Sequence, residues 1–386
     1  MKLGHAIGRV TVLALLLLAG CTARPPKPTV ITFWQPFEAS AYDSLAARFE
    51  RENPGVRVDV RTIPAAAMRD SIVAALATGS VPDLAVLDST VMPALLAHGD
   101  LSDWSAGVAD LRDSLAGWEL CSVGDAIYGM PWLLETRVLW YRPDAMARAN
   151  LDPARAFASW QDFGAAAARL RAAGAPLGLP VDAVMGVPAA CLFAYGGLLG
   201  PEGRDSLVLD SPEARAAFAL LSRVRTSART ATSAELARAL AAGRVGALVA
   251  PRGLVAEGGG VTCVSLPAAD RASGACSGVQ SGLVLASFVR SAHKEAALRF
   301  ARSLAAPASA ATCAAVFPGL SPAASTSGAF AEQARRDWTP PAAEQGPARA
   351  AVIGAALDAV LFARALPDST LPGAQARLDA LRAERP

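Results

Sequence analysis

Strand and helix patterns alternate along residues 30–88, and this order constrains the fold more than any other feature of the chain. Residues 30–34 form a β-branched and aromatic run, 56–60 alternate between apolar and polar residues, and 82–88 are apolar with polar ends, so each predicts a strand. Between them, 39–53 and 65–78 carry apolar side chains at helical spacing. The order β-α-β-α-β predicts parallel strands with helices on the sheet faces, an α/β domain.

The remainder of the 386 residues continues the mixed pattern and is long enough for a second domain with its own core. Two extended pieces, 127–132 and 138–141, are joined by the polar set Glu135-Thr136-Arg137. Further strands are expected at 247–250, 261–264 and 283–286, and further helices at 144–149, 160–173, 211–224, 233–242, 294–304 and along the tail after Phe330.

The N-terminus has the composition of a secretory signal. Lys2 and Arg9 precede a short apolar run that ends in small residues directly before Cys21. The run is shorter than the roughly 20 residues that span a bilayer. This segment resembles the lipobox of bacterial lipoproteins, which implies a signal peptide over 1–20, lipid on Cys21 and a tether over 21–29. An ordinary cleaved signal with a coincidental cysteine is the alternative. We expect an exported protein, lipid-anchored to the membrane and facing the periplasm or cell exterior.

Charge and cysteine content exclude several classes of protein. A formal net charge of +2 gives no electrostatic case for nucleic-acid binding. Five cysteines remain beyond Cys21, and an exported compartment permits disulfides. Cys263 and Cys276 flank a turn region and are candidates for a local disulfide, and an odd number leaves at least one thiol free unless a partner chain contributes. With no Cys-x-x-Cys and three scattered histidines, we expect no metal site and no cofactor.

Four segments together resemble one known family. They are 31–34 with 49–58, then 79–84, 128–141 and 243–248. In this order and spacing, behind a lipobox, they resemble the maltose-binding-protein-like extracellular solute-binding proteins, which deliver sugars and related solutes to ABC importers. The resemblance extends over most of the mature chain and weakens in the tail.

The resemblance implies a two-lobed periplasmic-binding-protein fold of class α/β. Each lobe would be a mostly parallel sheet flanked by helices, and a multi-strand hinge would join the lobes around a ligand cleft. The chain would cross between lobes near 133–135, 278–282 and 318–321. It also implies a monomer that binds a small sugar or polyol and meets the permease subunits of an ABC importer. The lobes are predicted as 30–134 plus 283–320 and 135–282 plus 321–386.

Candidate ligand residues are those that can stack on a sugar ring or pair with its hydroxyls, and that follow predicted strands or lie at the crossovers. In open α/β sheets, ligands gather beyond the carboxyl ends of the strands. The candidates are Trp34, Gln35, Glu38, Asp88, Ser89, Trp132, Glu135, Arg137, Tyr195, Gly197, Arg252, Gly253, Gln280 and Ser281.

Each candidate also has a structural interpretation. Trp34 and Trp132 are equally suited to core or rim packing, because large aromatic side chains bury much area. Asp88 could cap the following helix, and Glu135 with Arg137 could be a solvated pair. One departure from the family concerns residues 251–254, Pro-Arg-Gly-Leu, where relatives often carry a large aromatic. Fewer stacking platforms and more charge favour a small sugar, a polyol or a phosphorylated polyol over a long oligosaccharide.

Two other functional classes remain open at this point. Ser291 and Lys294 match Ser-x-x-Lys, an acyl-transfer motif, but no Ser-Asp-Asn or Lys-Thr-Gly accompanies it. Glu135 with Asp88 could in principle serve a glycosidase, although nothing selects them over binding. We therefore expect a binding protein rather than an enzyme. A tethered binding protein that serves a receptor without transport is the third possibility.

Overall fold

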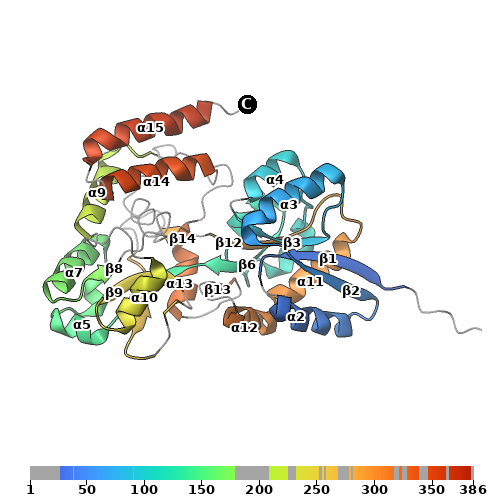
Figure 1. The fold of residues 1–386 in the computed structure, drawn as a ribbon, viewed down its shortest axis with the longest axis horizontal. Coiled ribbons are helices and arrows are strands. Elements are labelled where there is room, and N and C mark those ends of the chain that lie inside the picture. The colour runs from blue at the N-terminus through green and yellow to red at the C-terminus, as the bar shows by residue number, and fades with distance from the viewer. Residues whose placement is uncertain are drawn as a thin grey trace, which may run out of the picture.

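The computed structural model shows two lobes side by side, joined by strands that cross between them (Figure 1). The first lobe contains the N-terminal strands, and the second contains the last helices of the chain. The described residues are 27–37, 39–89, 91–178, 208–224, 232–251, 254–255, 258–267, 278–279, 281–316, 321–323, 328–338, 347–361 and 365–383.

A six-stranded sheet forms the centre of the first lobe. The β-α-β-α-β order predicted for residues 30–88 is confirmed, since β1 pairs in parallel with both β2 and β3. β12 runs antiparallel to β3 and β6, so β6 points the same way as β1 and β3. The strands, in spatial order, are β13 (Ser321–Pro322), β6 (Met130–Glu135), β12 (Ser281–Ala286), β3 (Leu84–Asp88), β1 (Thr29–Gln35) and β2 (Val56–Thr62).

Helices cover this sheet through periodic apolar faces. In the helix at Ala39–Glu52, Tyr42, Leu45, Ala46 and Phe49 are all buried, which is the spacing of one helical face. The Phe33 ring of β1 meets the rings of Tyr42 and Phe300 edge-on, each at 5.3 Å between centroids. The helices are α2 (Ala39–Glu52), α3 (Ala65–Thr78), α4 (Met92–His98), α11 (Lys294–Ala305) and α12 (Pro307–Val316), with the small hairpin β4 (Ser122–Val123) and β5 (Ala126–Ile127) beside them.

A buried carboxylate joins three segments of this lobe. Asp83, at the entrance to β3, accepts hydrogen bonds from the Thr32 backbone N–H at 2.8 Å and from the Ser291 hydroxyl at 2.6 Å. The Ser291 hydroxyl also accepts from the His293 backbone N–H at 3.1 Å, directly before α11. The serine of the Ser-x-x-Lys tetrad therefore ties α11 to the sheet in this structure.

Replacing Asp83 by Ala is expected to destabilise the protein by about 2 kcal/mol, because the Thr32 N–H and the Ser291 hydroxyl would lose their buried acceptor. Urea denaturation of this variant measures the loss. Asp70→Ala, an exposed position on α3, is the matched control and should stay close to the wild type. Equal stability of the two variants would show that the Asp83 cluster contributes nothing net.

The second lobe is built on a four-stranded sheet with the order β10-β7-β9-β8. β7 runs antiparallel to both β9 and β10, and only β8 with β9 is parallel. The predicted two-lobed α/β fold is confirmed, but both sheets are mixed rather than mostly parallel, because β12 and β13 in the first sheet and β7 in the second run against the other strands. The strands are β7 (Arg137–Tyr141), β8 (Leu177–Gly178), β9 (Ala247–Pro251) and β10 (Thr262–Val264).

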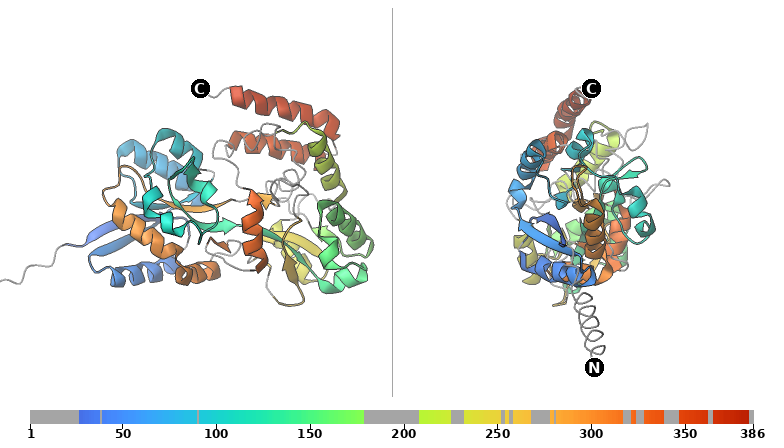
Figure 2. Two further views of the ribbon diagram at one scale, coloured as in Figure 1. Left: turned by 180° about the vertical axis from the view of Figure 1, so that it is seen from behind. Right: turned by 90° about the vertical axis from the view of Figure 1, so that its right-hand side faces the viewer.

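Two helices of the second lobe, α7 and α10, begin at residues whose side chains accept hydrogen bonds from free backbone N–H groups. Thr232 and Glu235 form a capping box at the start of α10, and the Ser159 hydroxyl accepts from the Asp162 N–H at the start of α7. The helical tail predicted after Phe330 is present, and its last two helices pack on each other and on α9 (Figure 2). The helices are α5 (Pro143–Arg148), α6 (Pro153–Ala156), α7 (Trp160–Ala172), α9 (Pro212–Val224), α10 (Ser233–Ala241), α13 (Gly328–Arg336), α14 (Pro347–Leu361) and α15 (Pro367–Ala383).

The two lobes are connected where short strands meet. β6 leads directly into β7, and β11 (Gly278–Val279) precedes β12 by one residue. β11 pairs in parallel with β14 (Asp337–Trp338), which follows α13. The domain boundaries predicted from the sequence stay a prediction.

The cysteines divide by their burial. Cys121 and Cys313 are buried free thiols in the first lobe. Cys263 lies on β10 and is partly buried, while Cys276 lies outside the described residues. The Cys263–Cys276 disulfide therefore stays a prediction, as does lipidation of Cys21, which also lies outside the described residues.

Candidate functional site

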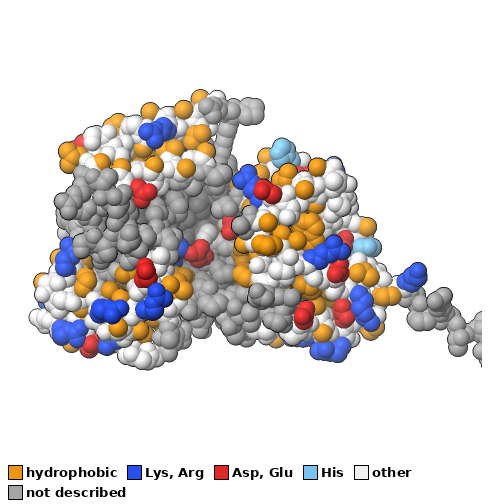
Figure 3. All heavy atoms as spheres, in the orientation of Figure 1, with side chains coloured by type: hydrophobic (Ala, Val, Ile, Leu, Met, Phe, Trp, Pro, Cys, Tyr) orange, Lys and Arg blue, Asp and Glu red, His pale blue; other side chains and the backbone are white. Residues whose placement is uncertain are grey.

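Several predicted site residues meet at one edge of the first sheet. Because β1, β3 and β6 run the same way, their carboxyl ends, Gln35, Asp88 and Glu135, share an edge. β12 runs the opposite way, so its first residue, Ser281, lies at this edge too. The edge faces the second lobe, because β6 continues into β7 there, and the surface between the lobes is hollowed on the face shown in Figure 3. The topology thus brings a strand-end site and the lobe crossover together.

The crossover holds an interacting set of polar side chains. Ser281 is the register partner of Glu135, and its hydroxyl donates to Glu135 Oε2 at 3.1 Å. The other carboxylate oxygen of Glu135, Oε1, is ion-paired with Arg137 Nη2. The Arg137 side chain is 16% exposed and that of Glu135 33% exposed. We call Glu135, Arg137 and Ser281 the crossover cluster.

Two buried polar atoms of this segment have no hydrogen-bond partner among the described residues. They are Arg137 Nε and the hydroxyl oxygen of Thr136, whose side chain is fully buried. Buried donors and hydroxyls in native proteins nearly always have a partner, and leaving one unpaired costs on the order of 1–3 kcal/mol. The crossover therefore retains hydrogen-bonding capacity that the neighbouring described side chains do not use.

Ser89 and Gln35 have structural roles at the same edge. The Ser89 backbone N–H donates to the Gly282 carbonyl at 2.9 Å, which joins the end of β3 to β12, and its side chain is 2% exposed. Gln35 is fully buried, and its amide nitrogen donates to the Phe37 carbonyl and to the Thr62 hydroxyl, both at 2.8 Å. Gln35 therefore shapes the turn after β1 rather than presenting its amide to the space between the lobes.

The two predicted stacking residues have different surroundings. Trp132 is 2% exposed, its indole N–H donates to the Leu304 carbonyl at 3.3 Å, and its ring lies 5.6 Å from that of Tyr42. The structure thus gives Trp132 a packing role in the core of the first lobe. Trp34 is only partly buried, and Asp88 is exposed at the end of β3. Among the predicted residues that the structure describes, Trp34, Asp88 and the crossover cluster lie at the edge of the first sheet that faces the second lobe and also have solvent-accessible atoms.

Six predicted ligand residues cannot be located. Glu38, Tyr195, Gly197, Arg252, Gly253 and Gln280 lie outside the described residues.

The structure adds a carboxyl group that the sequence analysis missed. Asp337 is the register partner of Gly278, and its Oδ1 accepts from Gln333 Nε2 at 2.6 Å. Burial raises the pKa of Asp337 to about 7, although the Gln333 hydrogen bond and the charge of Arg137 each lower it. The sequence pattern after Phe330 is helical, and a two-residue strand within it has no local signal.

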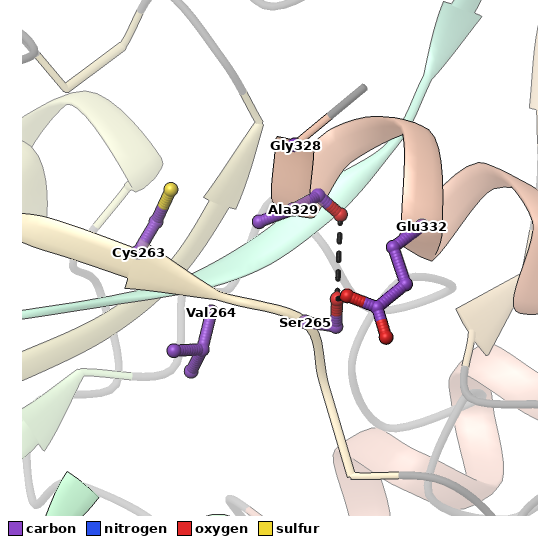
Figure 4. Close-up of a pocket in the computed structure, with 6 residues that line it drawn as sticks. All are labelled: Cys263, Val264, Ser265, Gly328, Ala329 and Glu332. Carbon is purple, nitrogen blue, oxygen red and sulfur yellow. Dashed lines mark hydrogen bonds between the residues drawn. The ribbon is translucent and has the colours of Figure 1, made fainter. Parts of the chain in front are cut away.

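A pocket of about 660 Å³ lies on the second lobe, between β10 and the start of α13. Its polar lining comes from Ser265 and Glu332, and the Ser265 hydroxyl lies 3.1 Å from the Glu332 carboxylate and 3.4 Å from the Ala329 carbonyl oxygen (Figure 4). None of the predicted ligand residues lines it. Across the described ranges, no group of three or more His, Cys, Asp and Glu side chains could hold a metal ion.

The profile of the bacterial extracellular solute-binding proteins matches residues 36–311. The match spans both lobes and most of the chain. The chain belongs to this family. The resemblance inferred from the four sequence segments is thereby confirmed. Because the proteins of this family are extracellular, the match also supports the expectation that the chain is exported. Among the residues described, no helix combines the length and apolarity needed to cross a membrane.

Individual curated relatives share less than 30% sequence identity with the chain and match only about half of it. The chain is 29% identical over 220 residues to an uncharacterized lipoprotein in the oleD 5′ region of Streptomyces antibioticus, which covers 50% of this chain and 46% of the relative. It is 28% identical over 184 residues to the sn-glycerol-3-phosphate-binding periplasmic protein UgpB of Escherichia coli O1:K1, covering 44% of this chain and 42% of that protein. The chain thus spans less than half the length of these curated relatives.

A solved structure supports the architecture. The sugar-binding protein MalE from Xanthomonas citri superposes with a TM-score of 0.76 at 20% identity, covering 92% of this chain and 98% of MalE. At this identity the match establishes the two-lobed fold and not the ligand.

Proposed function

We propose that the protein captures a carbohydrate or related polyol between its lobes and delivers it to the permease subunits of an ABC importer. The observation that carries the proposal is the family match across both lobes, together with the crossover cluster at the edge where they meet. Membership of the family supports solute binding, and we propose both the importer as partner and the chemical class of the solute.

The crossover cluster suits a solute rich in hydroxyl groups. Glu135 offers carboxylate acceptors, and Arg137 offers guanidinium donors, including the buried Nε that has no partner in the described part of the chain. Arg also binds phosphate oxygens well through its planar fork. This chemistry fits the names of two relatives, one sugar-binding and one sn-glycerol-3-phosphate-binding, and it supports a small sugar, a polyol or a phosphorylated polyol.

The remaining parts of the proposal concern position and closure. Trp34 would supply an apolar face and Asp88 an acceptor at the rim of the site, and the lobes would close on the solute about the crossovers. We propose a monomer without enzymatic activity, held at the membrane by lipid on Cys21. A lipoprotein among the relatives supports the anchor.

Replacing Arg137 by Ala is expected to weaken solute binding by about tenfold or more, because hydrogen bonds to a charged donor are lost. The measurement is a thermal-shift screen of the chain from Thr22 onward against maltose, sn-glycerol 3-phosphate and glycerophosphocholine, followed by calorimetry of any compound that binds. A solute that binds only the folded state must raise Tm. Arg48→Ala, on an exposed face of α2, is the matched control and should bind like the wild type.

Three results would contradict the proposal. No shift with a broad panel of sugars, polyols and phosphorylated polyols would count against the solute class. Normal binding by the Arg137 variant would place the solute elsewhere than the crossover. Turnover of nitrocefin or an aryl glycoside would instead favour an enzyme.

A further inference from the structure

Asp337 lies at the crossover, although it is far from the cluster in sequence. It pairs with Gly278 on β11, and three positions further along this segment Ser281 pairs with Glu135. Because consecutive Cα atoms are about 3.8 Å apart, the Cα atoms of Gly278 and Ser281 lie within roughly 11 Å of each other. The charge of Arg137 acts on the Asp337 carboxyl. The pairing of β11 with β14 and of β12 with β6 therefore places Asp337 near Glu135 and Arg137, so that the charges of these three side chains act on one another.

The Asp337 carboxyl is held in place by a buried amide. Gln333, on α13, is fully buried and donates to Asp337 Oδ1 at 2.6 Å. The other end of the Gln333 amide accepts from the Leu266 backbone N–H at 2.7 Å, just after β10. Gln333 is thus fixed at both ends, and it fixes one oxygen of a carboxyl that is itself only partly exposed.

Among the described residues, few charged groups lie on the elements around Asp337. α13 carries Glu332 and Arg336, which are ion-paired with each other, and also Arg335. β7 contributes Arg137 and β6 contributes its partner Glu135, whereas β11 carries no titratable residue. With Asp337 protonated, Glu135 and Arg137 balance each other; with Asp337 ionised, the three groups carry one net negative charge.

We propose that Asp337 is a positioning residue of the solute site, whose protonation state sets how much positive charge Arg137 offers to a bound solute. An anionic solute is bound more tightly when Asp337 is protonated, and a neutral sugar is affected much less. This inference rests on the proposed function for its solute, but the link between Asp337 and Arg137 exists without one.

The link is tested first without solute, by measuring Tm of the chain from Thr22 onward between pH 5 and pH 8. Burial places the pKa of Asp337 at about 7 in the folded protein, above its value of about 3.9 in the unfolded chain. Between these two values the folded state holds a proton that the unfolded chain has released, so stability falls as the pH rises from about 4 and levels off above about 7. A fall of roughly 5 °C is expected.

Variants assign this fall to Asp337 and to Arg137. Asp337→Asn keeps an oxygen for Gln333 and should remove most of the pH dependence. Asp70→Asn, exposed on α3, should leave it unchanged. Arg137→Gln should move the midpoint to higher pH, because Arg137 lowers the pKa of Asp337. Parallel profiles for the wild type and Asp337→Asn, or an unmoved midpoint in Arg137→Gln, would overturn the inference.

The second measurement uses two probes by calorimetry at pH 6 and pH 8. Glycerophosphocholine carries a phosphodiester whose charge is constant in this range, and maltose is neutral. We expect about tenfold weaker binding of glycerophosphocholine at pH 8 in the wild type, and no such change in Asp337→Asn. Affinity for glycerophosphocholine that does not vary with pH would overturn the inference. Absence of binding by both probes contradicts the proposed solute class, and the Tm profiles then still decide between coupling and no coupling of Asp337 with Arg137.

Discussion

Replacing Trp132 by Ala is expected to destabilise the protein by about 4 kcal/mol, because it removes a fully packed aromatic side chain from the core of the first lobe. The ring is 2% exposed, lies beside Tyr42, and ties β6 to α11 through its hydrogen bond to the Leu304 carbonyl. Truncation would leave a cavity and an unpaired carbonyl group. Urea denaturation, followed by far-UV circular dichroism, measures the loss.

Trp34→Ala is the comparison that separates packing from solute binding. Trp34 is only partly buried at the end of β1, so its removal should cost about 1 kcal/mol and weaken the binding of any solute identified in the screen. If Trp132→Ala kept wild-type stability and lost binding instead, its ring would be a stacking platform, as the sequence first suggested.

The local patterns of the sequence predicted much of the fold. The apolar residues of α2 repeat at helical spacing and all four lie in the core, and the strands around residues 31, 58 and 86 pair as their order indicates. The mixed direction of the sheets could not be predicted in the same way. It depends on which strands cross between lobes, and this is set by contacts between segments more than a hundred residues apart, such as Leu133 with Leu283.

The candidate site was predictable only in part, for similar reasons. Glu135, Arg137 and Ser281 are polar residues at strand ends, and strand ends at a crossover meet. Trp34 and Trp132 also lie near the ends of strands, but β6 is buried on both faces along most of its length, so alternation along the strand did not show that Trp132 points into the core. Asp337 had no signal, because its partner Gly278 is identified only by the fold.

Gly282 occupies a place where no side chain fits. It lies on β12 between Ser281 and a register shift at Leu283, and an added Cβ would lie 2.5 Å from the Leu133 carbonyl oxygen and 3.2 Å from Leu134 Cα. Its own carbonyl accepts from the Ser89 N–H at 2.9 Å. β6 and β12 therefore approach closely at the residue that adjoins the crossover cluster.

Replacing Gly282 by Ala is expected to destabilise the protein by about 3 kcal/mol, since the clash is with backbone and one of the two strands must move. The same movement should disturb the pairing of Ser281 with Glu135, so solute binding should weaken together with stability. Gly55→Ala is the matched control, because an added Cβ there meets no atom within 4 Å, and it should change stability by less than about 0.5 kcal/mol. Urea denaturation and calorimetry on both variants measure the two effects. A stable Gly282→Ala protein with normal affinity would mean that the crossover is loosely packed, and that the solute does not depend on the geometry of β6 and β12.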